Sequence, residues 1–445
     1  MQAGPALAVD YSRQAMSADP DHIGWLPNTW LSLLASGHAG SLPSGQRFDA
    51  AVLLADVAGF TSLTERYAQS GPAGAEQMSE LLNRRFGALI AITRRLGGDI
   101  THFAGDAIVA IWCASSATAL ASAAQRAAQC ALEIQALPVV DQDAALLPIR
   151  AGVSVGSAWW AVLGEADDQA FVVGGQPVLR AGAAAAAGQP GEVIVSAEAW
   201  ALLQPLAGGS PLARSDLHRL HRLDQTARSA VAPLPAAAPQ RLLPRILRQR
   251  LASGGDWLAE FRRVTVLFAS FGDIDFAAPP QLDQAQAAIR SVLGSIARYD
   301  GMLHQLVADG PGAVLIAAWG LPSVLHEDDA RRGIEAALSM ARELKALGLS
   351  PAIGVATGRV FCGVRGSPLR RDWAIMGDGM NLAARLMRAA GSGVLCDEDT
   401  AYAARQRLDF EPLPAIQLKG KSRPVAVLRP IARSGAPRAS TDRSD

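Results

Sequence analysis

The feature that most constrains this chain is an internal repeat with a period of about 200 residues. The motif Arg150-Ala-Gly-Val-Ser-Val-Gly156 is matched by Ala352-Ile-Gly-Val-Ala-Thr-Gly358, so the final glycines lie 202 positions apart (358 minus 156). The apolar run at residues 51–55 is likewise matched by residues 264–269. A repeat of this length indicates two duplicated domains rather than a solenoid of short units.

Each copy alternates short apolar runs with longer segments of helical periodicity. In the first copy we expect strands at 51–55 and 149–155, a strand pair within 100–112, and helices at 61–96 and 118–136. In the second copy we expect a helix at 284–299 and a strand pair within 303–315. This pattern predicts an α+β fold of two domains, each a sheet with helices on one face.

Length and composition fit two domains. The chain has 445 residues, of which 50% are hydrophobic, enough to bury two sizeable cores. Prolines such as Pro233 and Pro239 mark a linker between the copies. We expect an N-terminal extension at 1–45, domain 1 at 46–204, a Pro/Arg-rich linker at 205–257, domain 2 at 258–432 and a disordered tail at 433–445.

The balance of charge excludes several kinds of partner. Basic and acidic residues both number 41, so the formal net charge is zero, and we expect binding neither to nucleic acid nor to anionic membranes. No apolar run approaches the ~20 residues that span a bilayer, and the first residues lack the pattern of a secretory signal. These observations predict a cytoplasmic protein.

Two aspartates in domain 1 lie at strand ends, where a carboxylate could take part in catalysis. Asp56 ends the apolar run at 51–55 and precedes Gly59 and a helix, whereas Asp106 lies at a tight turn between two apolar runs. Alone, Asp56 could be a helix cap and Asp106 an ordinary hairpin residue. Together, two strand-end carboxylates in one domain fit a pair of divalent metal ions that assist phosphoryl transfer.

The segments around these aspartates resemble a known family. Ala55-Asp-Val-Ala-Gly-Phe-Thr61, Gly97-Gly-Asp-Ile100 and Phe103-Ala-Gly-Asp-Ala-Ile-Val-Ala-Ile-Trp112 look like the metal-binding motifs of class III nucleotide cyclases. In the second copy, residues 354–363, Met380-Asn-Leu-Ala-Ala-Arg385 and Leu418-Lys-Gly-Lys-Ser-Arg-Pro424 resemble the same family. The likeness covers 48–205 and 262–430, and is nearest to the soluble, bicarbonate-regulated adenylate cyclases.

The resemblance implies two ferredoxin-like domains packed as a pseudo-symmetric intramolecular pair, with a site shared between the two copies. Two Mg²⁺ or Mn²⁺ ions would be held by domain 1, Asn381 would orient the ribose, and Arg385 would stabilise charge on the phosphate. Arg150 would bind the triphosphate, although a solvated arginine on a strand is the plainer reading. The implied metal ligands are Asp56, Val57 and Asp106; the implied nucleotide contacts are Gly59, Phe60, Thr61, Arg150, Gln305, Ala374, Ile375 and Lys419.

The sequence departs from the family pattern in three places. Ser270 replaces Asp56 in the second copy, and the first copy lacks the Asn-x-x-x-Arg spacing, so the resemblance implies only one competent site. Gln305 and Ala374 stand where adenylate cyclases read the base with two polar residues. At the twin site, His102 and Arg180 would replace the residues that bind a regulatory anion such as bicarbonate, although His102 could equally be an ordinary strand residue.

We therefore expect a monomeric adenylate cyclase that makes 3′,5′-cyclic AMP and pyrophosphate from ATP. A guanylate cyclase and an inactive nucleotide sensor with the same fold remain open alternatives at this point, because Ala374 offers no polar group to a base.

Overall fold

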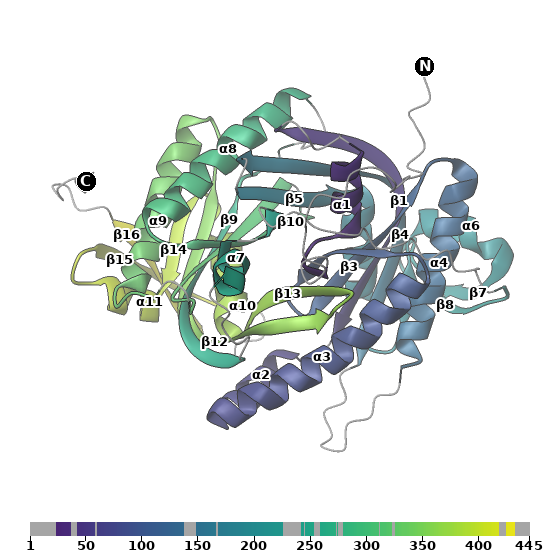
Figure 1. Ribbon diagram of the computed structural model, residues 1–445, viewed down its shortest axis with the longest axis horizontal. Coiled ribbons are helices and arrows are strands. Elements are labelled where there is room, and N and C mark those ends of the chain that lie inside the picture. Colours follow the sequence, from purple (N-terminus) through teal and green to yellow (C-terminus); the bar gives the residue numbers. More distant parts are fainter. Residues whose placement is uncertain are drawn as a thin grey trace.

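The two copies fold into two mixed eight-stranded sheets with helices packed against them (Figure 1). The computed structural model describes residues 24–36, 42–57, 60–137, 148–165, 168–225, 242–243, 245–252, 259–272, 274, 279–310, 312–322, 325–417 and 424–431.

The first sheet has the strand order β2-β3-β1-β4-β6-β8-β7, with β5 paired to β4. Only β4 and β6 run parallel among the pairs of this sheet in the described residues. Its strands are β1 (Ser44–Val57), β2 (Asp99–Ala104), β3 (Ala107–Ala114), β4 (Ile149–Glu165), β5 (Asp168–Gly175), β6 (Val193–Val195), β7 (Ala207–Pro211) and β8 (His218–Leu223).

The second sheet repeats this order as β10-β11-β9-β12-β14-β16-β15, with β13 paired to β12. The identical topology confirms the duplication that the repeat predicts. Its strands are β9 (Glu260–Ser270), β10 (Met302–Gly310), β11 (Gly312–Trp319), β12 (Ala352–Ser367), β13 (Arg370–Met376), β14 (Gly393–Asp397), β15 (Asp409–Ile416) and β16 (Val425–Ile431).

Helices cover both faces of the first sheet, not one face as the sequence led us to expect. Ala51 and Leu53 point into a core formed with the long helices, whereas Val52 points into a second core shared with domain 2. The reason is the period of two along β1, which is apolar on both faces. The helices are α1 (Asn28–Ala35), α2 (Phe60–Ala68), α3 (Gly71–Arg95), α4 (Ala117–Gln135), α5 (Gln176–Ala187), α6 (Ala197–Leu203), α7 (Arg245–Ala252), α8 (Pro279–Arg298), α9 (Asp329–Ala346), α10 (Asp378–Ala390) and α11 (Glu398–Ala404).

The two domains exchange β-hairpin arms. The β12–β13 arm of domain 2 inserts Phe361, Ala374 and Met376 into the core of domain 1. The β4–β5 arm of domain 1 inserts Trp159 and Val172 into the core of domain 2. Each domain therefore completes the hydrophobic core of the other, and the two should unfold cooperatively.

The N-terminal segment bridges the domains. The backbone N–H groups of Asn28 and Thr29, at the start of α1, donate to the carboxylate of Asp99 at 3.1 and 2.7 Å. From domain 2, the guanidinium of Arg370 donates to the carbonyl of Trp25 at 3.3 Å, and Arg371 lies 4.8 Å from the Trp25 ring. The segment thus fixes β2 against β13.

Two expected boundaries differ from the structure. The linker expected at 205–257 begins too early, because β7 and β8 complete the first sheet and therefore belong to domain 1. The single helix expected at 61–96 is two helices, α2 and α3. Gly71, the first residue of α3, has a φ of 61°, which the interior of a continuous helix does not allow, and Pro72 follows in the first turn of α3. The expected disordered tail lies outside the described residues.

Candidate active site

The carboxyl-bearing half of the site lies at one end of the first sheet. Asp56 is the penultimate residue of β1, directly opposite Arg150 on β4. The guanidinium of Arg150 donates to the Asp56 carboxylate at 2.5 Å. Asp106 lies in the turn between β2 and β3, where Gly105 has a φ of 63°, and its carbonyl accepts from the N–H of Val57 at 3.2 Å. The turn is therefore tied to the end of β1.

The two carboxyl groups are close enough to share a proton or a cation. Burial, the charge of Asp56 and a hydrogen bond between the two side chains raise the pKa of Asp106 well above the usual range for an aspartate. Two carboxylates that repel one another in a partly dry site gain most from a divalent cation between them. This donor set therefore fits the metal ions implied by the family resemblance.

Domain 2 supplies the other half of the site. Asn381 and Arg385 lie one turn apart on α10, and both line a cavity of about 310 Å³. Asp106 and Gly105 of domain 1 line the same cavity, as do Gln305 and Ile375 of domain 2. The structure thus brings the turn that carries Asp106 in one copy against the helix that carries Asn381 and Arg385 in the other.

A buried arginine that the sequence analysis missed connects the two halves. Arg365, with only 2% of its surface exposed, donates to the carbonyl of Gly105 across the domain boundary. Its Nε and Nη2 atoms donate to the two carboxylate oxygens of Asp372 at 3.1 and 2.8 Å. The guanidinium also lies 4.5 Å from the ring of Phe103. Arg365 therefore holds the turn at Gly105 and Asp106 against β13.

The two predicted base-reading positions differ in placement. Gln305 lines the 310 Å³ cavity, and its Nε2 atom donates to Asp372 at 3.4 Å. Ala374 is 1% exposed and packs in the core that α3 shares with β13, so its side chain is not among those lining the cavity. Its neighbour Ile375 lines the cavity with an apolar surface.

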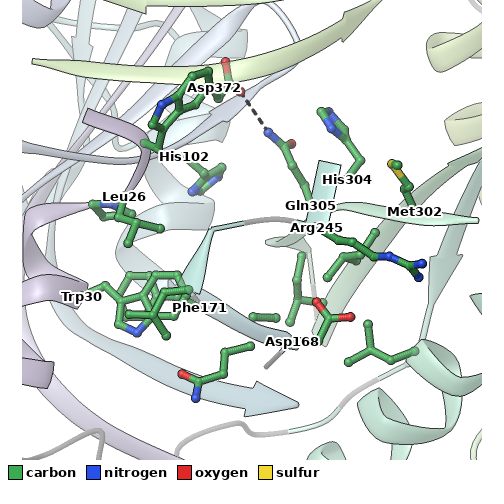
Figure 2. Close-up of a pocket in the computed structure, with 18 of the residues that line it drawn as sticks. Leu26, Trp30, His102, Asp168, Phe171, Arg245, Met302, His304, Gln305 and Asp372 are labelled. Carbon is green, nitrogen blue, oxygen red and sulfur yellow. Dashed lines mark hydrogen bonds between the residues drawn. The ribbon is translucent and has the colours of Figure 1, made fainter. Parts of the chain in front are cut away.

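Figure 2 shows a second, smaller cavity of about 150 Å³ that contains the predicted regulatory residue His102. Gln305 lines this cavity as well as the larger one. Burial, with a contribution from the charge of Arg370, lowers the pKa of His102 to about 4. His102 is therefore neutral near pH 7 and supplies no positive charge to an anion.

The structure does not bring Arg180 to His102. Arg180 lies on α5 with 44% of its side chain exposed, and it pairs with Glu198 at 2.6 Å. It is absent from the described linings of both cavities.

Part of the expected nucleotide site cannot be placed. Gly59 and Lys419 lie outside the described residues, and Phe60 and Thr61 are described only as the start of α2. No three or more His, Cys, Asp or Glu side chains cluster as a metal site in the described ranges. A metal ion at Asp56 and Asp106 would thus take further ligands from backbone carbonyls, water or substrate oxygens.

Residues 43–220 match the family described as the adenylate and guanylate cyclase catalytic domain. The first domain is a class III cyclase domain. A crystal structure of a class III adenylyl cyclase-like ATP-binding protein from Pseudomonas aeruginosa covers 81% of this chain and 85% of its own, with a TM-score of 0.57 and 15% identity. That likeness is one of fold, and it extends the class III cyclase fold to the tandem pair.

Curated relatives share the same tandem region. Adenylate cyclase type 10 from Homo sapiens is 27% identical over 441 residues, which covers 87% of this chain but only 27% of the relative. The Mus musculus protein of the same name is 26% identical over 434 residues and covers 86% of this chain. This chain thus spans about a quarter of the length of these relatives.

Among the helices that the structure describes, none is both long and apolar enough to cross a membrane.

Proposed function

We propose that this class III cyclase is an adenylate cyclase that converts ATP to 3′,5′-cyclic AMP and pyrophosphate at the domain interface. The observation that carries the proposal is the single cavity lined by Asp106 from domain 1 and by Asn381 and Arg385 from domain 2. Both halves belong to one chain, so a monomer would contain the complete site.

Asp56, Asp106 and the carbonyl of Val57 would hold two divalent ions, Mg²⁺ or Mn²⁺. When bound, such ions lower the pKa of a ribose hydroxyl and neutralise phosphate charge. In the structure the guanidinium of Arg150 pairs with the Asp56 carboxylate. With metal ions bound beside Asp56, Arg150 would be available to bind the triphosphate.

The reaction forms a bond between the ribose 3′-oxygen and the α-phosphorus and breaks the bond from that phosphorus to the bridging oxygen, so that pyrophosphate leaves. Asn381 would hold the ribose by hydrogen bonds, which keeps the attacking oxygen in line. Arg385, one turn further along α10, would stabilise the negative charge that grows on the phosphoryl oxygens.

The test is direct. Purified full-length protein is incubated with ATP and either Mg²⁺ or Mn²⁺, and cyclic AMP and pyrophosphate are measured together. Equal amounts of both products are expected from the wild type and none from Asp106→Ala. A folded protein that binds ATP yet forms neither product would reject the proposal in favour of a nucleotide sensor.

Guanylate cyclase activity is the second candidate, and the burial of Ala374 favours it. Without a polar group at that position, one of the two usual contacts to adenine is missing. Incubating ATP and GTP together and measuring the two cyclic products would separate the candidates.

A further inference from the structure

Arg365 places a buried positive charge of domain 2 against domain 1. It lies near the tip of the β12–β13 arm, which packs along α3 of domain 1 (Figure 1). Its guanidinium lies 5.0 Å from the ring of Phe86 and 4.5 Å from the ring of Phe103, both in domain 1. The Nη1 atom donates to the carbonyl of Gly105, also in domain 1, whereas Nε and Nη2 donate to Asp372 on β13. The charge is therefore neutralised within the arm and is used across the domain boundary.

An arm can dock without this ion pair, as the other arm shows. The registers of β4 with β5 and of β12 with β13 are equivalent, so that Leu163 corresponds to Arg365 and Ala170 corresponds to Asp372. Leu163 and Ala170 are buried and pack in the core of domain 2. A buried ion pair gains little over apolar residues of similar volume, because the cost of desolvation offsets the attraction. Docking of the arm therefore does not account for the ion pair.

The group that Arg365 reaches is the turn that carries Asp106. A Cβ atom at Gly105 would meet no atom within 4 Å, so hydrogen bonds hold this turn where side-chain packing does not. The carbonyl of Asp106 accepts from the N–H of Val57 at 3.2 Å, and the preceding carbonyl, that of Gly105, accepts from Arg365. Asp56 pairs in the β1–β3 register with the residue that follows Asp106. The position of the turn thus sets where the Asp106 carboxylate lies relative to that of Asp56.

We propose that Arg365 is a positioning residue for the divalent metal site: it holds the Gly105 carbonyl so that Asp106 faces Asp56, and thereby raises the affinity for Mg²⁺ or Mn²⁺. The inference rests on the proposed function, in which these two aspartates are metal ligands, and deepens it. Arg365 acts on the ligand-bearing turn and does not touch the ion. Its charge and that of Asp372 largely cancel at a distance, so the effect comes from position rather than from repulsion of the cation.

The assignment makes metal binding in domain 1 depend on the arm of domain 2. Linkage then requires the reverse effect as well: a bound ion stabilises the docked arm. Mn²⁺ should therefore raise the unfolding temperature of the wild type, and it should raise that of a protein without the Arg365 contact by less.

The experiment titrates the full-length protein with Mn²⁺ alone, measured by calorimetry and by the electron paramagnetic resonance of free Mn²⁺. No nucleotide is present, so changes on the base-reading side of the cavity do not enter. The test variant is Arg365→Leu with Asp372→Ala, which reproduces the pair found in the other arm and leaves the net charge unchanged. Its affinity for Mn²⁺ should fall about tenfold, the lower end of the loss typical for residues that orient metal ligands. Without Mn²⁺ it should unfold at about the wild-type temperature.

Asn83→Ala is the matched control. The Oδ1 atom of Asn83, on α3, accepts from the N–H of Gly366 at 2.9 Å, so this variant loses another hydrogen bond between domain 1 and the same arm. That bond does not reach the turn, and the affinity for Mn²⁺ should stay at the wild-type value. An equal loss in Asn83→Ala would show that arm docking in general sets the affinity, and it would overturn the inference. If the double variant does not fold, Arg365→Met with Asp372→Asn decides by the same comparison.

Failure of the proposed function and failure of this inference are distinguishable. If the wild type forms no cyclic AMP from ATP, the proposed activity fails, whereas a tenfold loss of Mn²⁺ affinity in the double variant would still support the role of Arg365. If the wild type forms cyclic AMP and the double variant binds Mn²⁺ as tightly as the wild type, the activity stands and the inference is overturned. Asp106→Ala should remove the titrated signal, which identifies it with this site.

Discussion

The two interface sites differ in charge although they are built by the same fold. At the first site, β1 presents Asp56 opposite Arg150, whereas at the second, β9 presents Ser270 opposite Ala352. The helices at the two sites also differ, and the polar residue is again at the first site. Asn381 is the fourth residue of α10, and its equivalent on α5 is Leu179.

The two copies therefore share the packing of their helices on their sheets, but they differ in the residues at the two interface sites. Gly152 approaches the backbone of α5 as closely as Gly354 approaches α10, so the helix-to-strand contact is the same in both copies. The polar residues compared above, Asp56 and Arg150 in domain 1 and Asn381 in domain 2, all lie at the first site. One site therefore has the charged and polar residues that the proposed phosphoryl chemistry requires, and the twin has Ser270, Ala352 and Leu179 at the equivalent positions.

The largest expected effect comes from substituting the proposed metal ligands of domain 1. Asp56→Ala or Asp106→Ala should lower turnover of ATP by at least about 10³-fold, because each removes a ligand of the proposed metal ions. Ser270→Ala alters the equivalent position of the twin site and should leave turnover unchanged. Steady-state assays at saturating Mn²⁺ measure both, and a strong loss in Ser270→Ala would break the comparison.

The helices provide the second test. Arg385→Ala should lower kcat about 10²-fold with a smaller change in KM, because its contact strengthens as charge grows on the phosphate. Arg180→Ala, on the exposed face of α5, should leave the basal rate unchanged. If Arg180→Ala removes a response to bicarbonate, the twin site has a regulatory role that its apolar character does not suggest.

The third test concerns packing that the two copies share. A Cβ atom at Gly98 would lie 2.5 Å from Trp112, and one at Gly301 would lie 2.5 Å from Trp319. Gly98→Ala and Gly301→Ala should each lower the free energy of unfolding by about 1–3 kcal/mol. Urea titrations followed by tryptophan fluorescence should show similar losses. Loss in only one variant would mean that the copies no longer pack alike.

The smallest effect concerns how two equivalent helices begin. The hydroxyl of Ser116 accepts from the N–H of Ala119 at 3.1 Å at the start of α4, whereas Asp328 before α9 pairs with Arg331 and Arg332. Burial opposes ionisation of Asp328, but hydrogen bonds from the two arginines lower its pKa to about 2.

The ion cluster before α9 should add a pH-dependent contribution to stability that the Ser116 cap before α4 does not. A lowered pKa contributes stability that is present above about pH 4 and is lost as the pH falls toward 2. Because Asp328 is 38% exposed, Asp328→Asn should cost less than about 1 kcal/mol at pH 7. Ser116→Ala should cost about 1 kcal/mol at every pH. Thermal unfolding from pH 7 to 3 compares them, and a pH-independent cost for Asp328→Asn would contradict the assignment.

The sequence by itself determined the duplication, the strand at residues 51–55 and the turn that carries Asp106. These features depend on local apolar runs and turn residues, which leave a period in the sequence. The resemblance of residues 380–385 to class III cyclases singled out Asn381 and Arg385, and their spacing places both on one helical face. The structure joins these positions with Asp106 in one cavity.

Only the tertiary structure decided how the base-reading side of the site is built. Arg365 reaches Gly105, which is 260 positions away, because the β12–β13 arm crosses into domain 1. No local pattern in the sequence predicts such a contact. Charged residues in two largely apolar strands were the signal that could have pointed to Arg365 and Asp372. Arg180 shows the converse: it stands near the expected motif, yet the rotation of α5 turns it to Glu198 and to solvent.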